Sequence, residues 1–448
     1  MGVYLLVVLG ATAAISDVAS ACSSWPLCAE VPTLGTPTLA VAWAHRGLAA
    51  LVFLLLVVTT VCALRSGGVS TRVRAALGVA LVLYPIQIAV GALVVLEGAA
   101  YTPLVHLGAG MAIFAALTLA LAWHLEPERD ETTTSPADLE PASDTVTDDV
   151  EQPPMPEGAL GQFRAVAMAY VRLTKPRLMW LLCLVAAAAM ALAADPSLSV
   201  RTVALTLGGG VLAIGASGTF NHVFERERDK RMARTSDRPV ATHQIPVANA
   251  VAFGAALGVA SLAVFVQLNL LAAALGFVAI LFYSVVYTLV LKPNTVQNTV
   301  IGGAAGSLPA LIGWAAVTGG VGLPGLALAG VIFVWTPAHF YNLALAYRDD
   351  YERGGFPMMP VVRGEATTRK HVLLWLGATL LAATVLAALT TLGWVYAATT
   401  VVLGSVFLWA VVRLHRERTE RAAFRAFHAS NAYLGALLLA VVVDALAL

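Results

Sequence analysis

The chain has 448 residues, of which 59% are hydrophobic and only 12% are charged, and its mean hydropathy is +0.81. Roughly a quarter of the residues of a typical soluble domain are charged, so this composition excludes a soluble globular protein. A net charge of +1 at pH 7 argues against a nucleic-acid binder, and four cysteines are too few for a disulfide scaffold.

Apolar stretches of about 20 residues, long enough to cross a bilayer, recur along the whole chain. Before residue 126 they cover approximately 3–21, 42–64, 76–97 and 103–123. After residue 165 they cover approximately 178–195, 201–220, 247–265, 268–291, 297–318, 324–346, 370–392, 394–412 and 426–447. Because lipid offers backbone groups no hydrogen-bond partner, these segments must be helices. We therefore predict an all-α membrane protein of about thirteen transmembrane helices, with the first retained rather than cleaved as a signal peptide.

The stretch between the two groups of spans has a different composition. Eleven of the 26 acidic residues lie between Glu126 and Glu157, where Arg129 is the only base, and prolines recur. Such a stretch cannot bury enough apolar surface to fold. We predict a four-helix membrane domain over 1–125, a disordered acidic linker over 126–165 and a nine-helix membrane domain over 166–448.

The positions of lysine and arginine predict the orientation in the membrane. If the N-terminus lies in the cytoplasm, only Arg46 and Arg201 of the 27 basic residues fall on or near the outer side. Cytoplasmic loops carry an excess of Lys and Arg. We therefore expect a multi-pass protein of the cell membrane, with the N-terminus and the charged loops of the nine-helix domain in the cytoplasm.

The sharpest motif begins where the span 201–220 ends. Asn221, Glu225 and Asp229 recur every four residues, so on a helix they share one face. Oxygen ligands of this kind suit Mg²⁺, which is often bound by protein carboxylates and substrate phosphates together. Six bases between Arg226 and Arg238 add charge that can neutralise a diphosphate. A solvated cytoplasmic loop would explain the bases, but it does not explain the strict spacing of the Asn and the two carboxylates.

A second polar segment begins within the span 324–346. It starts around His339, contains Asp350 and other acidic residues after the span, and ends in a Gly- and Pro-rich stretch at Pro360. The predicted orientation places both loops on the same side of the membrane. Two acidic clusters that converge there would form a site for two Mg²⁺ ions bridged by diphosphate.

Two such loops among nine helices resemble the UbiA superfamily of intramembrane prenyltransferases. The first loop is similar to the Asn-x-x-x-Asp-x-x-x-Asp motif of that superfamily, with Glu225 in place of the first Asp. Further segments most resemble the haem-farnesylating branch, the protohaem IX farnesyltransferases or haem O synthases: Leu173–Arg177, Asp229–Thr235, Tyr287–Pro309, Pro337–Phe340 and Asp350–Pro360. The resemblance covers about 165–448, and Pro293 departs from it, because these enzymes often have Arg there.

The resemblance implies an enzyme that transfers farnesyl from farnesyl diphosphate to the 2-vinyl group of haem b (protohaem IX). Water adds as well, and haem O for terminal oxidases and diphosphate are formed. It also implies Mg²⁺ and these catalytic metal ligands: Asn221, Glu225, Asp229 and Asp350. The implied diphosphate clamps are Lys175, Arg234, Arg238 and Lys292. The resemblance also implies that His339 contacts haem, although a buried core histidine without this role explains it equally well. For Lys175, the alternative to a diphosphate clamp is a helix start with an anchor at the membrane edge, and it is nearly as well supported.

The first four spans carry a second set of residues. His45 opens the second span and His106 opens the fourth, both near the outer face, and two histidines on facing helices commonly ligate haem. Cys22 and Cys28 lie outside, where a disulfide persists. Residues 1–124 resemble one half of haem A synthase, which implies a bound haem, although Ala42 stands where that family has an acidic residue. A membrane anchor with incidental histidines is the alternative.

Two other functions remain open. One is the same enzyme class with a quinone ring or a lipid headgroup as the acceptor. The other is a haem-binding carrier or transporter, although a transporter would place its charges at mid-membrane. The expected partners are farnesyl diphosphate, protohaem IX and membrane lipid, together with haem A synthase or oxidase assembly proteins, and no nucleic acid.

Overall fold

The computed structural model describes residues 1–15, 22, 24–33, 35–96, 101–127, 135–136, 139, 154, 156–194 and 197–447. Twelve helices in these ranges are long and apolar enough to cross a membrane, which confirms the predicted all-α membrane class. Of the thirteenth predicted span, 3–21, the structure describes only residues 3–15, so this span stays a prediction. Helix α1 (Gly2–Ile15) has 14 residues, and at 1.5 Å per residue it is about 21 Å long, shorter than the hydrocarbon core. The rest of that predicted span lies outside the described residues.

The chain forms two compact units. The first comprises Met1–Asp130, Arg369–Arg418 and His428–Leu448, and the second comprises Glu131–Thr368 and Thr419–Phe427. The division into compact units does not test the domain boundaries predicted at 125 and 165. These boundaries stay predictions. Most of the predicted linker lies outside the described residues. Its end, 159–165, is helical, because apolar residues at helical spacing give this segment a face to bury.

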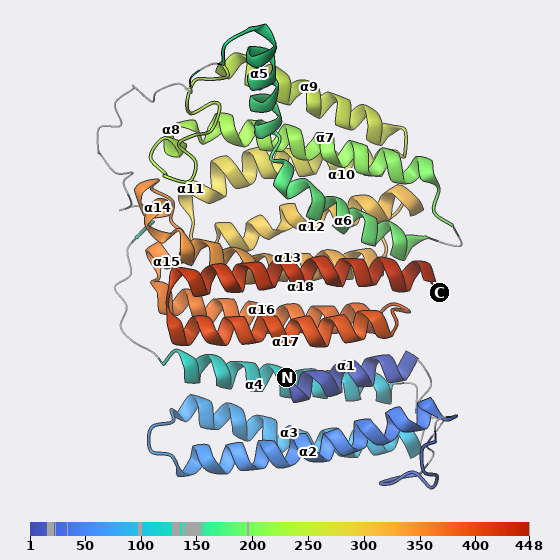
Figure 1. Cartoon of the computed structure of the whole chain (residues 1–448). Coiled ribbons are helices and arrows are strands. Elements are labelled where there is room, and N and C mark those ends of the chain that lie inside the picture. Colours follow the sequence, from blue (N-terminus) through green and yellow to red (C-terminus); the bar gives the residue numbers. More distant parts are fainter. Residues whose placement is uncertain are drawn as a thin grey trace. The chain divides into compact units, whose positions relative to one another are not determined.

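The first unit contains helices from both ends of the chain. They are α1, α2 (Pro37–Arg65), α3 (Thr71–Leu96), α4 (Thr102–Leu125) and most of α16 (Glu365–Ala388), α17 (Trp394–Glu417) and α18 (Glu420–Ala447) (Figure 1). The Tyr4 hydroxyl donates a hydrogen bond to the Leu380 carbonyl at 3.3 Å. Arg369 Nε lies 2.6 Å from Glu126 Oε1, and both side chains are buried. The N-terminal helices therefore pack directly on helices from the C-terminal part of the sequence.

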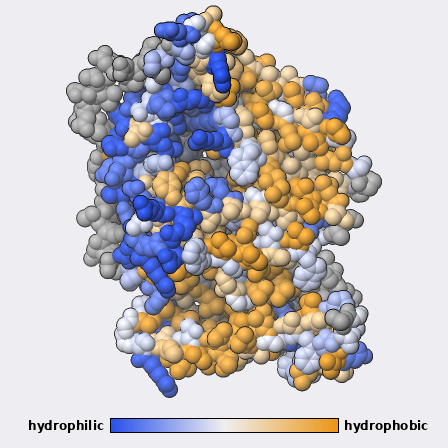
Figure 2. Space-filling view, in the orientation of Figure 1, coloured by the Kyte–Doolittle hydropathy of each residue, from blue (hydrophilic) through white to orange (hydrophobic). Residues whose placement is uncertain are grey.

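The second unit holds the two polar loops. Its helices are α5 (Ala159–Leu173), α6 (Pro176–Ala193), α7 (Val200–Phe224), α8 (Arg226–Asp229), α9 (Val247–Val266), α10 (Leu270–Leu281), the π-helix η2 (Phe282–Leu291), α11 (Lys292–Asn294), α12 (Asn298–Thr318), α13 (Leu323–Ala346), α14 (Arg348–Arg353) and α15 (Met359–Val362). The short helices α8, α11, α14 and α15 gather at one end of the long ones (Figure 1). Hydrophilic residues are concentrated at this end (Figure 2). Both polar loops of the sequence thus lie at the same end of the unit.

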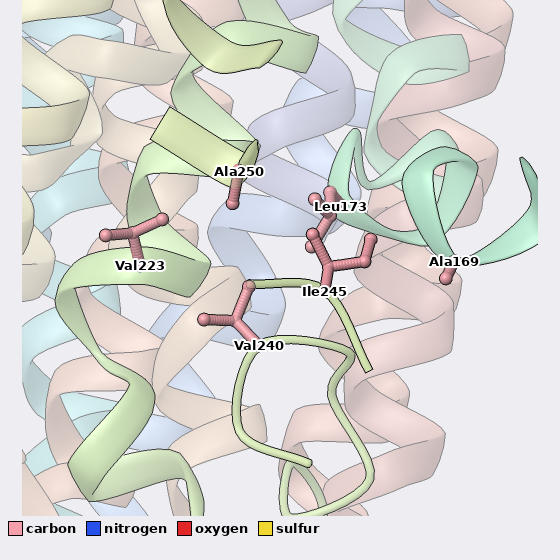
Figure 3. Packing of buried hydrophobic residues seen from close by; sticks show 6 residues of the cluster. All are labelled: Ala169, Leu173, Val223, Val240, Ile245 and Ala250. Carbon is pink, nitrogen blue, oxygen red and sulfur yellow. The ribbon is translucent and has the colours of Figure 1, made fainter. Parts of the chain in front are cut away.

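A buried hydrophobic cluster fixes the first polar loop to the helices around it. It joins α5, α7, the loop and α9 through Ala169, Leu173, Val223, Val240, Ile245 and Ala250 (Figure 3). Val240 and Ile245 are the contribution of the loop, and both are almost fully buried. Since burying one such side chain stabilises a fold by about 1.5–3 kcal/mol, the end of the loop is held firmly next to α7.

Candidate active site

The end of α7 carries the three predicted metal ligands. Asn221, Glu225 and Asp229 are only 2%, 3% and 1% exposed. Although α7 ends at Phe224, the backbone bonds continue in four-residue steps, from Glu225 N to the Asn221 carbonyl (3.0 Å) and from Asp229 N to the Glu225 carbonyl (2.8 Å). The structure therefore brings the three side chains onto one face at the end of α7, as the spacing predicted.

Each of these three side chains meets a cation. Lys175 Nζ donates a hydrogen bond to Asn221 Oδ1. Lys292 Nζ lies 2.6 Å from Glu225 Oε1. Arg238 Nη1 lies 2.7 and 2.9 Å from the two oxygens of Asp229, and 3.6 Å from Glu225. Two carboxylates thus face three cations in a buried cluster, so its formal charge is positive and it suits an anion.

Burial and the neighbouring charges shift the pKa values of this cluster. Burial alone would raise the pKa of Glu225, but Lys292, Lys175 and Arg238 outweigh it and lower that pKa. For Asp229 burial wins over Arg238, and the pKa is raised. Burial, reinforced by Arg238, lowers the pKa of Lys175 well below its ordinary value. The Lys175 ammonium is thus poorly solvated, and a bound anion would stabilise its charge.

The π-helix η2 supplies the opposite wall of the cluster. Tyr283 Oη lies 3.3 Å from Lys175 Nζ, and Thr288 Oγ1 accepts a hydrogen bond from Asn221 Nδ2 at 3.1 Å. Lys292, which meets Glu225, follows directly after η2.

The wider turn of η2 is what aligns these residues. In an α-helix, Tyr283 and Lys292 would be about two and a half turns apart, on opposite faces. A π-helix closes i to i+5 hydrogen bonds and brings residues four to five apart into line. Sequence analysis missed Tyr283 and gave Thr288 no role of its own, because a spacing of five and then four residues matches no α-helical face.

A glycine allows Lys175 to reach the cluster. A Cβ on Gly218 of α7 would lie 2.9 Å from the Leu173 carbonyl oxygen and 3.3 Å from Lys175 Cγ. Only glycine therefore lets α7 approach the backbone at the end of α5 this closely. The closeness places Lys175 beside Asn221, one turn further along α7.

The second polar loop holds the first one in place. Asp350 Oδ1 and Oδ2 accept hydrogen bonds from the backbone N–H groups of Ala233 (3.1 Å) and Arg234 (3.0 Å), and Arg353 also pairs with Asp350. These hydrogen bonds outweigh the effect of burial and lower the pKa of Asp350. Across the described ranges, no hydrogen bond or ion pair joins Asp350 to Asn221, Glu225 or Asp229, and no three His, Cys, Asp or Glu side chains form a metal-holding group. The structure thus divides the four predicted metal ligands into a set of three and a loop tether.

Aromatic side chains of the second loop contact the cations. Lys292 Nζ lies 4.3 Å and the Arg228 guanidinium 4.8 Å from the centre of the Phe356 ring. Arg234 lies over the rings of Tyr347 and Tyr351 at 5.1 and 5.6 Å. Such cation–π contacts orient the cationic side chains. Arg234 therefore points to the second loop, whereas Lys175, Arg238 and Lys292 are brought together at the carboxylates.

His339 lies in an aromatic stack in α13. Its ring is 4.4 Å from that of Trp335 and 4.2 Å from that of Phe427, with interplanar angles of 14° and 26°. The side chain is buried. The predicted haem contact of His339 stays a prediction, and the stack accounts for its burial.

The predicted haem ligands of the first unit are neighbours. The ring centres of His45 and His106 are 6.5 Å apart, both side chains are half-buried, and among the described residues Nδ1 of each has no hydrogen-bond partner. Two imidazoles that share a metal at about 2 Å from each ligating nitrogen stand roughly 6 Å apart. Gln87 Nε2 lies 3.3 Å from His106 Nε2. The spacing of the two rings is thus that of two axial ligands of one metal. Gln87 would compete with such a metal for Nε2 of His106.

A disulfide joins Cys22 and Cys28 on the loop between α1 and α2. Arg46, next to His45, donates hydrogen bonds from Nη1 to the carbonyls of Ser24 (2.9 Å) and Pro26 (3.1 Å). The disulfide loop is therefore tied to the helix that carries His45.

Comparisons with known proteins agree with this architecture. Residues 181–435 match the UbiA prenyltransferase family, and residues 36–144 match the cytochrome oxidase assembly protein family COX15-CtaA. The chain is 64% identical to a protoheme IX farnesyltransferase of Haloarcula marismortui and 63% identical to protoheme IX farnesyltransferase 1 of Natronomonas pharaonis. Each alignment covers 100% of this chain and 97% of the relative.

A solved structure shares the fold of about 60% of the chain. A digeranylgeranylglyceryl phosphate synthase superposes with a TM-score of 0.53 at 16% identity, over 63% of this chain and 100% of that one. A UbiA homologue from Archaeoglobus fulgidus, solved with GPP and Mg²⁺, gives a TM-score of 0.44 at 18% identity, over 62% and 100%. The first of these similarities shows the fold alone.

Proposed function

The chain belongs to the protoheme IX farnesyltransferase family of UbiA prenyltransferases, and we infer that it transfers farnesyl from farnesyl diphosphate to protohaem IX, forming haem O and diphosphate. The observation that carries this inference is the identity of 64% over the full length of a relative with that name. The reacting group is the 2-vinyl group of haem b, and water adds to it in the same reaction. The product serves haem A and haem O biosynthesis for terminal oxidases.

The cation cluster is the proposed diphosphate site. Diphosphate oxygens would take the hydrogen bonds that Lys175, Lys292 and Arg238 now give to Asn221, Glu225 and Asp229. The side-chain oxygens of the three ligands would then be free for Mg²⁺, a cation that prefers oxygen ligands. The residues thus fit Mg²⁺ and diphosphate together better than the metal alone. When bound, Mg²⁺ supplies positive charge that stabilises the leaving diphosphate.

Asp350 joins this set as a metal ligand in the proposal. A carboxylate has about four lone-pair sites, and the donors from Ala233, Arg234 and Arg353 use three of them. One site remains for a metal without breaking the tether between the loops. Arg234 would bind the terminal phosphate of the diphosphate. It lies over the ring of Tyr351 and donates a hydrogen bond to the Tyr351 hydroxyl at 3.3 Å.

The proposed reaction uses these residues as follows. The C–O bond of the allylic diphosphate breaks and its electron pair leaves with the diphosphate, which Lys175, Lys292 and Arg238 hold. The vinyl group forms a bond to the resulting allylic carbon, and water adds to the new cation and loses a proton. The burial of Asn221 and the two carboxylates keeps bulk water away from the allylic cation.

The first unit is proposed to bind a second haem between His45 and His106. The spacing of the rings supports this, and so do their Nδ1 atoms, which have no partner in the part of the chain that the structure describes. Bound there, haem would be held near the outer surface, and the unit would meet haem A synthase or oxidase assembly proteins. In this proposal the N-terminus and the polar loops face the cytoplasm, in the cell membrane.

The test uses the full chain in lipid nanodiscs. Incubation with haem b, farnesyl diphosphate and Mg²⁺ should yield haem O, identified by mass, with release of one diphosphate per product. Parallel reactions with a quinone precursor or a lipid headgroup as the acceptor should give no prenylated product. Turnover of one of these acceptors instead of haem b would overturn the assignment.

A further inference from the structure

Helix α5 has an apolar stripe that is largely exposed in the described part of the chain. Leu160 and Phe163 are 81% and 72% exposed, and Val171 is also exposed. With Ala167 they follow spacings of three, four and four residues, so they form one face of the helix. We call these four residues the α5 stripe.

The opposite side of α5 is packed. Ala169 and Leu173 belong to the buried cluster with Val223, and Tyr170 stacks edge-on against Phe253 with ring centres 4.9 Å apart. The helix is therefore held firmly against α7 and α9 by one side while it presents a second apolar side outward. This is unlike a solvated surface helix, whose outer side is polar.

The position of α5 points to the membrane surface. It runs across the direction of the long helices of its unit (Figure 1). The span α6 begins at Pro176, directly after α5, and Leu178 and Trp180 in its first turns are 43% and 56% exposed. Trp is enriched at the membrane–water interface. The α5 stripe therefore lies next to the level at which a lipid-facing helix enters the bilayer.

The charges around the stripe match lipid headgroups. Arg164 and Arg177 are exposed, and within the described residues neither forms an ion pair. Arg172, by contrast, pairs with Asp237 at 2.6 Å. Interfacial helices combine an apolar face with Arg or Lys beside it that reaches lipid phosphate.

We propose that α5 is an interfacial anchor, with the α5 stripe in the boundary between lipid headgroups and acyl chains and with Arg164 and Arg177 on lipid phosphates. The end of α5 leads directly into Lys175, and its Leu173 carbonyl packs at Gly218. The anchor thus fixes the depth at which Lys175 stands. This last consequence rests on the proposed function, whereas the anchor itself does not.

The test measures the depth of α5 in lipid. The full chain with Cys62→Ser and Cys183→Ser receives a single Phe163→Cys, labelled with the fluorophore NBD, in nanodiscs that mix phosphatidylcholine and phosphatidylglycerol. Gln162→Cys is the matched control, because Gln162 is also exposed but lies off the stripe. Leu178→Cys on α6 is the positive control for contact with lipid.

We expect the label at 163 to be blue-shifted and quenched several-fold more strongly by shallow doxyl lipids than the label at 162. A label at Leu160→Cys should behave like that at 163, which guards against a local effect of one substitution. Equal quenching at 162 and 163 would overturn the anchor. A blue-shifted label at 163 that doxyl lipids fail to quench would also overturn it, since protein and not lipid would then cover the stripe. Haem O formation by each labelled variant reports separately on the proposed function.

Discussion

One terminal nitrogen of the Arg238 guanidinium lies 2.7 and 2.9 Å from the two carboxylate oxygens of Asp229. A predicted diphosphate clamp and a predicted metal ligand therefore pair with each other. Removing one partner of a buried pair strands the other charge, which typically costs about 3–5 kcal/mol. Substitutions in this cluster must therefore be designed with stability in view.

We expect Asp229→Ala and Asp229→Asn to abolish prenyl transfer. Loss of one preorganised charge-stabilising group lowers the rate about 10²–10³-fold, and loss of the metal lowers it further. Asp229→Asn keeps the shape and leaves Arg238 an oxygen acceptor, so the thermal unfolding midpoint should fall less than in Asp229→Ala. Product formation and thermal unfolding are measured on the same preparations. Near wild-type turnover by either variant would refute the metal assignment.

Glu225→Asp should remain active. Both residues offer a carboxylate, but the shorter side chain draws back from Lys292, which now stands 2.6 Å from Glu225 Oε1. We therefore expect a moderate loss of rate at saturating Mg²⁺ and a higher Mg²⁺ requirement. Activity is followed over a Mg²⁺ titration, with Glu225→Gln as the control that removes the charge. If Glu225→Asp were as inactive as Glu225→Gln, the site would be shaped around the longer side chain.

Lys292→Met should weaken the binding of farnesyl diphosphate. A hydrogen bond to a charged group contributes about 1.5–3 kcal/mol, or roughly a 10- to 100-fold rise in KM. Arg238 remains 3.6 Å from Glu225 and limits the damage to the fold. The comparison is with Arg348→Met, at a half-buried arginine of the second loop whose nearest acidic oxygens are 3.7 Å away or more. Equal KM values for the two variants would remove Lys292 from the diphosphate site.

Thr288→Val should lower activity without loss of the fold. It removes the acceptor of the Asn221 side chain, and a neutral hydrogen bond contributes about 0.5–1.5 kcal/mol. Asn221 would then rotate more freely, so kcat should fall and the Mg²⁺ requirement should rise. Thr318→Val at the far end of α12 is the control. A change in KM for haem b alone would contradict this positioning role.

Haem binding by the first unit should depend on both histidines. In the full chain, His45→Ala and His106→Ala should each abolish a six-coordinate low-spin haem spectrum, while haem O formation continues. The full chain is needed, because Tyr4 and Glu126 pair with Leu380 and Arg369 from the C-terminal part of the sequence. Gln87→Leu should strengthen binding by releasing His106 Nε2. A spectrum that survives in both histidine variants would favour the membrane-anchor interpretation.

The membrane class and the central motif could be predicted from the sequence, because both depend on local spacing. The four-residue repeat of Asn221, Glu225 and Asp229 needs only a continuing helical backbone. The pairing of Lys292 with Glu225 could not be predicted, since it joins residues 67 positions apart through tertiary packing. The same holds for the packing of α1 and α4 on helices from the other end of the chain. Helix α5 was not predicted, because its first residues were assigned to the acidic linker over 126–165. Its apolar stripe is too short to stand out beside that composition.

The π-helix makes the site depend on the number of residues between Tyr283 and Lys292, and not only on their identity. Deleting Val285 or Val286 would let the backbone return to α-helical hydrogen bonds and turn the far side chains by about 100°. Lys292 would then leave Glu225, although every functional group of the site would still be in the chain. Alanine substitutions along this helix would not detect the dependence on residue number, because they keep the number of residues. Deletion of one valine would detect it.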